Sequence, residues 1–263
     1  MNLGLKGRTA VVGGASQGLG RAVALALAQE GITVALSARN EDRLRDTAEE
    51  IEKTTGVQAL PIRADHTQYA DIKRIVEQTI TTFGRIDILF TNTGGPTPGT
   101  FFDFDDRQWQ AAYEQLLLYV VRMCREVIPH MKRQRWGRII NNASVAVKEP
   151  YEDLLLSNVF RVGVTSLGKT LSRQMAQYNV LINTLCPGFT RTERAMALLQ
   201  RRAEARNISL EDMEKITVSE IPVGFIPYPE GVASLVVFLA SERASSLTGT
   251  TIQIDGGHTR GLL

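Results

Sequence analysis

The alternation of short apolar stretches with amphipathic ones limits the fold of this chain more than any other feature. Seven stretches are apolar enough to be strands buried on both faces, namely Thr9–Val12, Ile32–Ser37, Val57–Ile62, Ile86–Phe90, Arg138–Asn141, Val180–Leu185 and Thr250–Ile254. Between them, apolar residues recur with helical spacing, as in Ala22–Gln29, Arg43–Lys53, Asp71–Phe83 and Val232–Leu239. Strands joined through helices need right-handed crossovers. The pattern therefore predicts an α/β fold with a mostly parallel sheet covered by helices on both faces.

Composition and charge exclude several classes of protein. The 30 basic side chains nearly balance the 28 acidic ones, which leaves a net charge of +2 and no basic excess for nucleic acid. Hydrophobic residues make up 43% of the chain, yet its apolar runs, such as Leu116–Val121, are far too short to cross a membrane. Cys124 and Cys186 cannot build a disulfide framework, and the first residues do not resemble a secretory signal. We expect a cytoplasmic protein with one domain over residues 1–263 and no nucleic-acid or membrane partner.

Two segments interrupt the alternation and are expected where ligands bind. Thr93–Thr100 is rich in glycine and proline and follows the fourth strand, and Glu193–Glu220 is long and charged. Ligands of open parallel sheets lie at the carboxyl ends of the strands, where such connections gather. The segment 193–220 is therefore either a substrate lid or a solvated pair of helices. Its arginines Arg201, Arg202 and Arg206 could meet a carboxylate, although a solvated helix face is the simpler interpretation.

A glycine-rich turn follows the first expected strand and precedes a helix. Gly14, Gly18 and Gly20 let the backbone of this turn approach a pyrophosphate, whose charge then lies at the positive end of the helix. The end of the second strand distinguishes the two nicotinamide dinucleotides, because an acid there accepts the ribose 2′-hydroxyl and repels a 2′-phosphate. This chain has Arg39 instead, and an arginine fork suits a phosphate, although Gln17 adds no second cation. We predict a preference for NADP(H), with NAD(H) as the second choice.

Three motifs further along the chain complete a known pattern. They are Asp65 after the third strand, Asn92-Thr93-Gly94 after the fourth, and Pro187-Gly188 followed by Thr192. Together with the glycine-rich turn, they resemble the short-chain dehydrogenase/reductase family, especially its 3-oxoacyl-acyl-carrier-protein reductase-like members. The likeness covers nearly the whole chain, although Gly13 stands where the family has a threonine.

The resemblance implies a fold and a cofactor site. The fold is a single-domain Rossmann-type doubly wound sheet of about seven parallel strands, with a dinucleotide across its switch point. The implied cofactor-binding residues are Gly14, Ser16, Gln17, Gly18, Leu19, Gly20, Arg39, Asp65, Asn92, Gly94, Arg161, Pro187, Gly188 and Thr192.

The family's catalytic set of asparagine, serine, tyrosine and lysine is largely replaced in this chain. Ser144 aligns with the serine, but Ser157 replaces the tyrosine, Arg161 the lysine and Leu116 the asparagine. A serine hydroxyl is much less acidic than a phenol, and an arginine stays protonated, so the family's usual proton transfer is impaired. Asp153, four residues before Ser157, shares its expected helix face and is a minor candidate for the missing acid.

Two functions from different classes fit this pattern. The first is an NADP(H)-dependent oxidoreductase with a non-standard active site, interconverting a secondary alcohol and a small-molecule or 3-oxoacyl thioester carbonyl. The alternative is a catalytically silent dinucleotide-binding protein that acts as a sensor or assembly partner. The apolar helices Leu116–Val127 and Val159–Thr170, which pair subunits in the family, imply a homodimer or homotetramer. The three histidines lack metal-ligand spacing, and no metal is expected.

Overall fold

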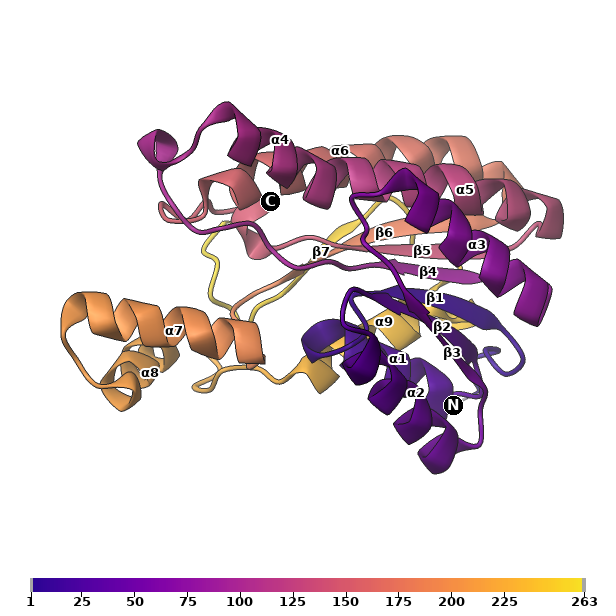
Figure 1. Cartoon of the computed structure of the whole chain (residues 1–263), viewed down its shortest axis with the longest axis horizontal. Helices are drawn as coiled ribbons and strands as arrows, with labels where there is room; N and C mark the ends of the chain where they lie inside the picture. Colours follow the sequence, from indigo (N-terminus) through magenta and orange to yellow (C-terminus); the bar gives the residue numbers. More distant parts are fainter. Residues whose placement is uncertain (1, 262–263) are drawn as a thin grey trace.

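The computed structural model describes residues 2–261, and they form one seven-stranded parallel sheet between two layers of helices (Figure 1). The strands are β1 (Thr9–Gly13), β2 (Thr33–Ala38), β3 (Ala59–Arg63), β4 (Ile88–Thr91), β5 (Gly137–Asn142), β6 (Val180–Pro187) and β7 (Thr251–Ile254). Each predicted strand is present with its bounds within two residues of the prediction. The predicted Rossmann-type fold is therefore confirmed.

The order of the strands creates a crevice at the carboxyl end of the sheet. The strands lie in the order β3-β2-β1-β4-β5-β6-β7, so the chain runs outward from β1 in one direction and then returns to continue from β4 in the other. Connections after β1 and β4 consequently leave toward opposite faces, and ligands of such sheets bind in the gap between them. The edge strands β3 and β7 are partly exposed, contrary to the prediction of burial on both faces, because each has a neighbour on one side only.

Helices cover both faces because alternate residues of a strand point to opposite sides. Val12 of β1 packs in a cluster with side chains of α1, α2 and α9, and its neighbour Val11 packs against α3, α5 and α6 (Figure 1). The helices are α1 (Gly18–Gln29), α2 (Glu41–Thr55), α3 (Tyr69–Phe83), α4 (Asp106–Tyr113), α5 (Tyr119–Gln134), α6 (Leu155–Met175), α7 (Glu193–Arg206), α8 (Leu210–Ser219) and α9 (Pro229–Ala240). No helix among residues 2–261 is long and apolar enough to span a membrane.

A π-helical turn interrupts the helix that the sequence predicts to run through Leu116. Glu114–Leu118 forms this turn between α4 and α5. A π-helical turn holds extra backbone per turn and changes which side chains face inward. Leu116 is buried in the interior, whereas the preceding Gln115 lines the pocket described below. The helix is continuous through α4, this turn and α5, as the sequence predicts, but the π-helical turn, which the sequence did not reveal, shifts its register.

The charged segment 193–220 forms the antiparallel pair α7 and α8, which extends beyond the sheet (Figure 1). Leu199, Ala203 and Met213 form a small buried cluster between the two helices. The pair therefore has its own apolar contact, and one side of α7 is free to face the carboxyl edge of the sheet.

Candidate active site

A pocket of about 940 Å³ lies along the carboxyl ends of β1, β2, β4, β5 and β6, with α7 forming one of its walls. It is lined by almost every residue that the sequence predicts for the cofactor or for catalysis. These residues are Gly14, Ser16, Gln17, Gly18, Leu19, Arg39, Asp65, Asn92, Gly94, Ser144, Ser157, Arg161, Pro187, Gly188 and Thr192. Gly20 is the exception, because it is buried beneath the turn, where a Cβ atom would clash with the Gly14 carbonyl.

The glycine-rich turn forms a cradle that only glycine can line. Gly14 and Gly18 have φ values of 59° and 57°, in the left-handed region that favours glycine. A Cβ atom on Gly14 would also lie 2.7 Å from the Asn92 side-chain nitrogen. α1 begins at Gly18, so its unpaired N–H groups face this space. The cradle therefore fits the diphosphate of a dinucleotide.

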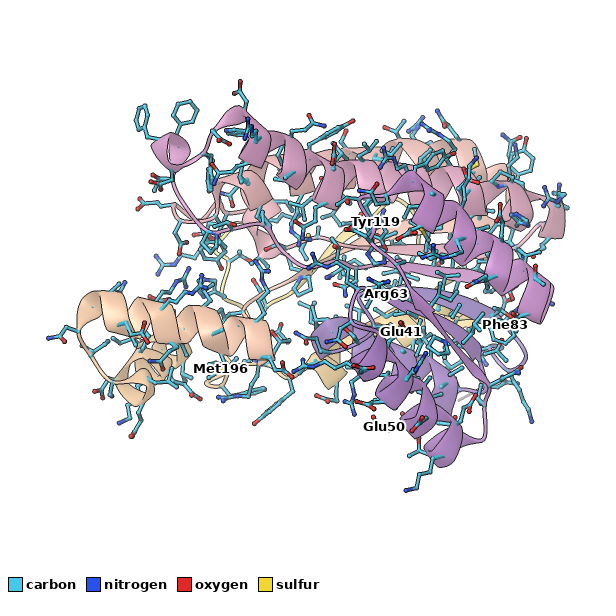
Figure 2. The ribbon with its side chains drawn as sticks, viewed as in Figure 1. Glu41, Glu50, Arg63, Phe83, Tyr119 and Met196 are labelled. Carbon is cyan, nitrogen blue, oxygen red and sulfur yellow. The ribbon has the colours of Figure 1, made fainter. Side chains whose placement is uncertain are left out.

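Tyr119 explains why Gly13 replaces the threonine of the resembled motif. Tyr119, labelled in Figure 2, is buried at the start of α5, and a Cβ atom on Gly13 would clash with its hydroxyl. Its ring stacks on His66 with 4.5 Å between the ring centroids. The tyrosine occupies the space beneath the turn that a side chain at position 13 would need.

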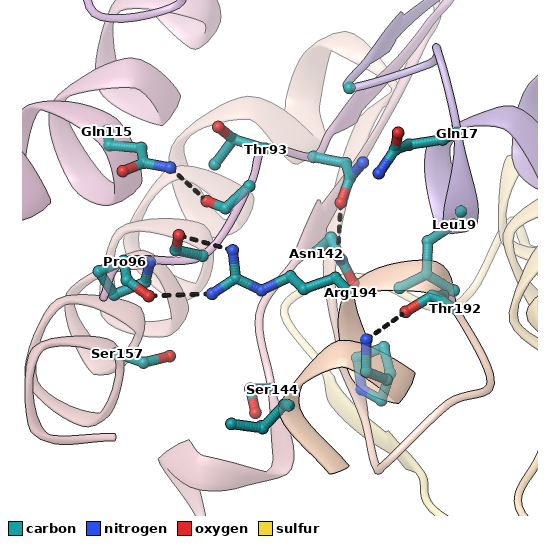
Figure 3. Close-up of a pocket in the computed structure, with 18 of the residues that line it drawn as sticks. Gln17, Leu19, Thr93, Pro96, Gln115, Asn142, Ser144, Ser157, Thr192 and Arg194 are labelled. Atoms are coloured by element: carbon teal, nitrogen blue, oxygen red, sulfur yellow. Dashed lines mark hydrogen bonds between the residues drawn. The ribbon is translucent and has the colours of Figure 1, made fainter. Parts of the chain in front are cut away.

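A chain of hydrogen bonds joins the glycine-rich turn to Ser157. The Asn92 amide donates to the Gly13 carbonyl at 3.1 Å, and the Asn142 amide donates to Asn92 Oδ1 at 2.8 Å (Figure 3). Arg161 Nη1 then donates to the Asn142 carbonyl at 2.8 Å. Arg161 Nε donates to Ser157 Oγ at 3.1 Å. The network holds the guanidinium and the serine in fixed positions beside the pocket.

Arg161 is a buried cation without a carboxylate partner among the described residues. Burial, followed by the charge of Arg194, lowers its pKa to about 10, so it stays protonated at neutral pH. Because Ser157 Oγ accepts a hydrogen bond from this cation, its own proton is free for another acceptor. Ser144 Oγ similarly accepts from the Ala146 N–H at 3.2 Å, which leaves the Ser144 proton free. Two hydroxyl donors therefore line the pocket.

The second strand ends beside two cations. Arg39 is exposed and lines the pocket. Arg43 on α2 donates to the Gln17 side chain and also to Glu193 at 2.9 Å. Gln17 itself adds no cation, as the sequence indicates, but the fold brings Arg43 in the first turn of α2 to the glycine-rich turn, and the sequence did not reveal this contact.

Comparisons with known proteins agree with this geometry. Residues 14–259 match the family model described as enoyl-(acyl carrier protein) reductase. The chain belongs to the short-chain dehydrogenase/reductase family. The predicted family and its oxidoreductase class are confirmed.

Three relatives illustrate what the chain is similar to within the family. It is 32% identical to the NADPH-dependent reductase BacG of Bacillus subtilis, over 97% of this chain and 99% of that protein. It is 31% identical to the 3-oxoacyl-[acyl-carrier-protein] reductase FabG of Staphylococcus epidermidis, over 95% and 98%. The crystal structure of L-sorbose reductase from Gluconobacter frateurii, complexed with NADPH and L-sorbose, matches with a TM-score of 0.95 at 30% identity and covers both chains fully. NADPH in two of these names agrees with the cofactor preference predicted here.

Gln115, Arg194 and Asn142 form hydrogen bonds in the pocket that were not predicted from the sequence. Gln115 donates to the Gly94 carbonyl at 2.6 Å, and Arg194 donates to the carbonyls of Gly95 and Pro96 at 2.8 and 2.9 Å (Figure 3). Asn142 links Asn92 to Arg161, as described above. Asn142 directly follows the fifth predicted strand, Arg138–Asn141, and that position was a signal in the sequence. Gln115 and Arg194 gave no such signal, because only the π-helical turn and the approach of α7 bring them to the pocket.

Asp153 does not act as the sequence suggested. α6 begins at Leu155, so Asp153 precedes the helix and does not share a helix face with Ser157 and Arg161. Its carboxylate binds Arg202 of α7 through both oxygens, the shortest contact being 2.7 Å. Asp153, the minor candidate for a substitute acid, is therefore held away from that role, since both of its oxygens bind Arg202 and it does not line the pocket.

The remaining candidates are structural. Cys124 and Cys186 are buried, as predicted, and burial raises their pKa values to about 12 and about 11, so neither thiol is ionised near neutral pH. Among residues 2–261, no three His, Cys, Asp or Glu side chains lie together as a metal site requires.

Proposed function

We propose that this protein uses NADPH to reduce a carbonyl, with Ser157, Arg161 and Ser144 in place of the family's tyrosine, lysine and serine. The hydrogen bond from Arg161 Nε to Ser157 Oγ carries the proposal. It couples a permanent cation to a pocket-lining hydroxyl, as the family couples lysine to tyrosine. The arginine cannot release its proton, so it acts through its charge.

The pocket fits the cofactor at each of its parts. The glycine cradle and the first turn of α1 hold the diphosphate, Arg39 holds the 2′-phosphate, and Asp65 lies at the adenine end. When bound, NADPH supplies the hydride that reduces the carbonyl carbon. Pro187 and Gly188 continue from β6 at the nicotinamide end. Arg43 supports Arg39 by adding positive charge beside Gln17.

Ser157 is the proposed proton donor. Reduction of a carbonyl leaves negative charge on its oxygen, and the free proton of Ser157 moves to that oxygen. The serine oxygen is then stabilised by the guanidinium of Arg161 and regains a proton from water. Ser144 donates a second hydrogen bond to the same oxygen and polarises the carbonyl beforehand.

The substrate enters between α7 and the loop after β4. Arg202 binds Asp153 and Arg194 binds Gly95 and Pro96, so two contacts hold α7 over the pocket. These contacts favour the interpretation of 193–220 as a substrate lid. The similarity to FabG makes a 3-oxoacyl thioester one candidate, and the similarity to L-sorbose reductase makes a hydroxylated ketone another.

We also propose that the protein works in the cytoplasm as a homo-oligomer paired through α5 and α6. An apolar groove runs between these helices, with Val121, Ile128, Leu167 and Leu171 in its lining. Val162 of α6 is exposed beside it. A second copy would cover this face. Light scattering at micromolar concentration tests the pairing, and a monomer would contradict it.

The test of the reaction is NADPH oxidation by the wild type and by Ser157→Ala, over 3-oxoacyl thioesters, hydroxylated ketones and simple ketones. We expect turnover that falls by about a hundredfold in Ser157→Ala while the Kd for NADPH changes by less than about threefold. Thr165→Ala, about two turns after Ser157 on the same helix and outside the pocket lining, is the matched control and should retain full activity.

A Ser157→Tyr/Arg161→Lys variant separates the two functions that the sequence allows. Wild-type turnover lost with Ser157 supports the proposed proton donor. A wild type that binds NADPH without turnover, beside an active double variant, supports the catalytically silent dinucleotide-binding protein instead. Equal activity of the wild type and Ser157→Ala would show that another group donates the proton.

A further inference from the structure

We propose that the substrate carries a carboxylate, held by Arg201 and Arg194 of α7. This inference rests on the proposed reductase function and specifies the substrate class of the same pocket. The two arginines are seven residues apart, which is close to two helical turns, so they lie on one face of α7. Both line the pocket.

The charges around α7 are uneven. Arg202, the next residue along, pairs with Asp153, and Arg191 pairs with Glu214. Within residues 2–261, by contrast, neither Arg194 nor Arg201 forms an ion pair, and Arg194 meets only backbone carbonyls. Arg191 and Arg202, which do not line the pocket, are thus neutralised by acids, whereas Arg194 and Arg201, which line it, are not.

The pocket contains no acid that could neutralise these arginines. Asp65 is its single acidic lining residue in the described part of the chain, and it belongs to the adenine end. Partial burial, and then the charge of Arg201, lower the pKa of Arg194. The charge of Arg194 in turn lowers the pKa of Arg161, after the larger effect of burial. Like charges held together in a partly desolvated pocket are unfavourable until an anion joins them.

The position of Arg201 separates it from the cofactor phosphates. α7 begins next to the glycine-rich turn, where the Thr192 methyl would lie 3.4 Å from a Cβ atom on Gly18. Arg201 lies eight residues further on, about 12 Å along the helix axis. The adjacent Arg202 fixes that end of α7 to Asp153, just before the helix that carries Ser157. Arg201 therefore lies toward the catalytic hydroxyls and away from the cradle.

The rest of the lining suits a short hydrocarbon chain between the carbonyl and the carboxylate. Leu154, which precedes α6, and Leu198, on the same side of α7 as the two arginines, both line the pocket. Apolar surface of this kind favours methylene groups over the hydroxyls of a sugar. The substrate class that follows is an oxo acid, bound with its ketone at Ser157 and its carboxylate at Arg201.

The experiment compares levulinate and acetoacetate with their methyl esters, which keep the ketone and lose the charge. For the wild type we expect kcat/KM to be about thirtyfold higher for the acids. Arg201→Gln should lower it about thirtyfold for the acids and less than about twofold for the esters. Arg206→Gln is the matched control, because Arg206 is the last residue of α7 and does not line the pocket.

Binding to the complex of the protein with NADP⁺, measured by calorimetry, keeps this inference distinct from the proposed reaction. Binding of an acid that depends on Arg201, without any turnover, would support the carboxylate site and overturn the reductase. Equal turnover of acids and esters would support the reductase and overturn the carboxylate site. No binding of either acid, or a rise of more than about threefold in the NADPH Kd of Arg201→Gln, would also overturn it. A preference for a coenzyme A thioester over a neutral cysteamine thioester, without a preference for the acids, would assign the arginines to a phosphate instead.

Discussion

Arginines gather at the amino-terminal ends of the strands (the amino edge) and at their carboxyl-terminal ends (the carboxyl edge). The two groups differ in their partners. At the amino edge, Asp87 is fully buried and accepts hydrogen bonds from Arg8 and Arg85, while Arg138 lies 3.6 Å from Glu242. At the carboxyl edge, the arginines of the pocket have no acidic partner among the described residues. The same residue type is therefore structural where acids neutralise it and available for a ligand where they are absent.

The aromatic environment strengthens this contrast. Trp136 lies between the guanidinium groups of Arg8 and Arg138, whose carbon atoms are 3.9 and 4.3 Å from its ring centroid. The Trp136 indole N–H also donates to Glu242 at 2.6 Å. The amino edge is thus a closed network of cations, acids and a ring. At the carboxyl edge, backbone carbonyls are the partners of Arg161 and Arg194, and they leave the positive charge uncompensated.

Breaking the amino-edge network should have the largest effect on stability. Asp87→Ala leaves Arg8 and Arg85 without their buried acid and the Thr9 N–H without its acceptor at 2.9 Å. We expect a loss of about 3 to 5 kcal/mol in the free energy of unfolding, measured in urea. The Kd for NADPH should not change, because the pocket lies at the opposite edge. A loss below about 1 kcal/mol in the free energy of unfolding would show that the arginines of the amino edge do not stabilise the fold.

The pH dependence of stability tests the carboxyl edge through His66. Burial lowers the pKa of His66 to about 4; the nearby charge of Arg39 acts in the same direction, and Asp65 and Asp71 act against it. Its pKa rises to 6.5 on unfolding, so the unfolded chain binds the extra proton between these values. The contribution of neutral, buried His66 to the free energy of unfolding is therefore complete above pH 6.5 and is lost as the pH falls toward 4.

The variant His66→Gln removes this titration. Between pH 6.5 and 4, the wild type should lose about 3 kcal/mol more stability than His66→Gln does, because 2.5 pKa units separate the two states. Urea unfolding over this range measures the difference. Parallel pH profiles of the two proteins would show that His66 is not held neutral in the fold.

The sequence predicted the fold well because local periodicity encodes it. Strands that are buried on both faces, such as β1 and β6, are mostly apolar, and the glycines of the turn are dictated by local backbone conformation. Asn92 and Ser144 come shortly after β4 and β5, and the resemblance to the family indicated them. These positions depend on contacts near in the sequence or on strand ends.

The errors came from contacts between distant segments. Arg43 reaches Gln17 and Glu193 across 26 and 150 residues, and Arg202 reaches Asp153 across 49. Spacing along the chain cannot reveal such pairs. Gln115 was missed for another reason, because the π-helical turn changes the face that the residue presents. The unpaired charges of α7 became visible only once the partners of its neighbours were known.

Cofactor selectivity provides a test of the carboxyl edge, where we expect a moderate change in the Kd for NADPH. Arg39→Ala removes the cation that we assign to the 2′-phosphate, and we expect the Kd for NADPH to rise about ten- to thirtyfold. The Kd for NADH should stay within about twofold, because that cofactor lacks the phosphate. Fluorescence titration measures both constants. Arg63→Ala is the control, since Arg63 ends β3 and does not line the pocket. An equal loss of affinity for both cofactors would contradict the assignment of Arg39 to the 2′-phosphate.

The smallest effect concerns Glu193, an acid that lies beside the carboxyl edge and pairs with Arg43. Both side chains are about half exposed, and such a pair contributes less than about 1 kcal/mol. Glu193→Gln should therefore change the free energy of unfolding by less than about 0.5 kcal/mol. Glu41→Gln, which breaks the exposed pair with Arg45 on α2, should have the same small effect.

The two variants should differ in cofactor binding, and that difference sharpens the comparison between the two edges. Glu193→Gln removes a negative charge beside Gln17 and frees Arg43, so we expect NADPH to bind about two- to threefold more tightly at low salt. Glu41→Gln changes a pair that does not line the pocket, and the Kd of this variant for NADPH should equal that of the wild type. Loss of the difference in high salt would confirm that charge is its cause. Weaker binding of NADPH by Glu193→Gln would instead show that the ion pair holds Arg43 in place for the cofactor. An acid at the carboxyl edge would then favour ligand binding by positioning an arginine.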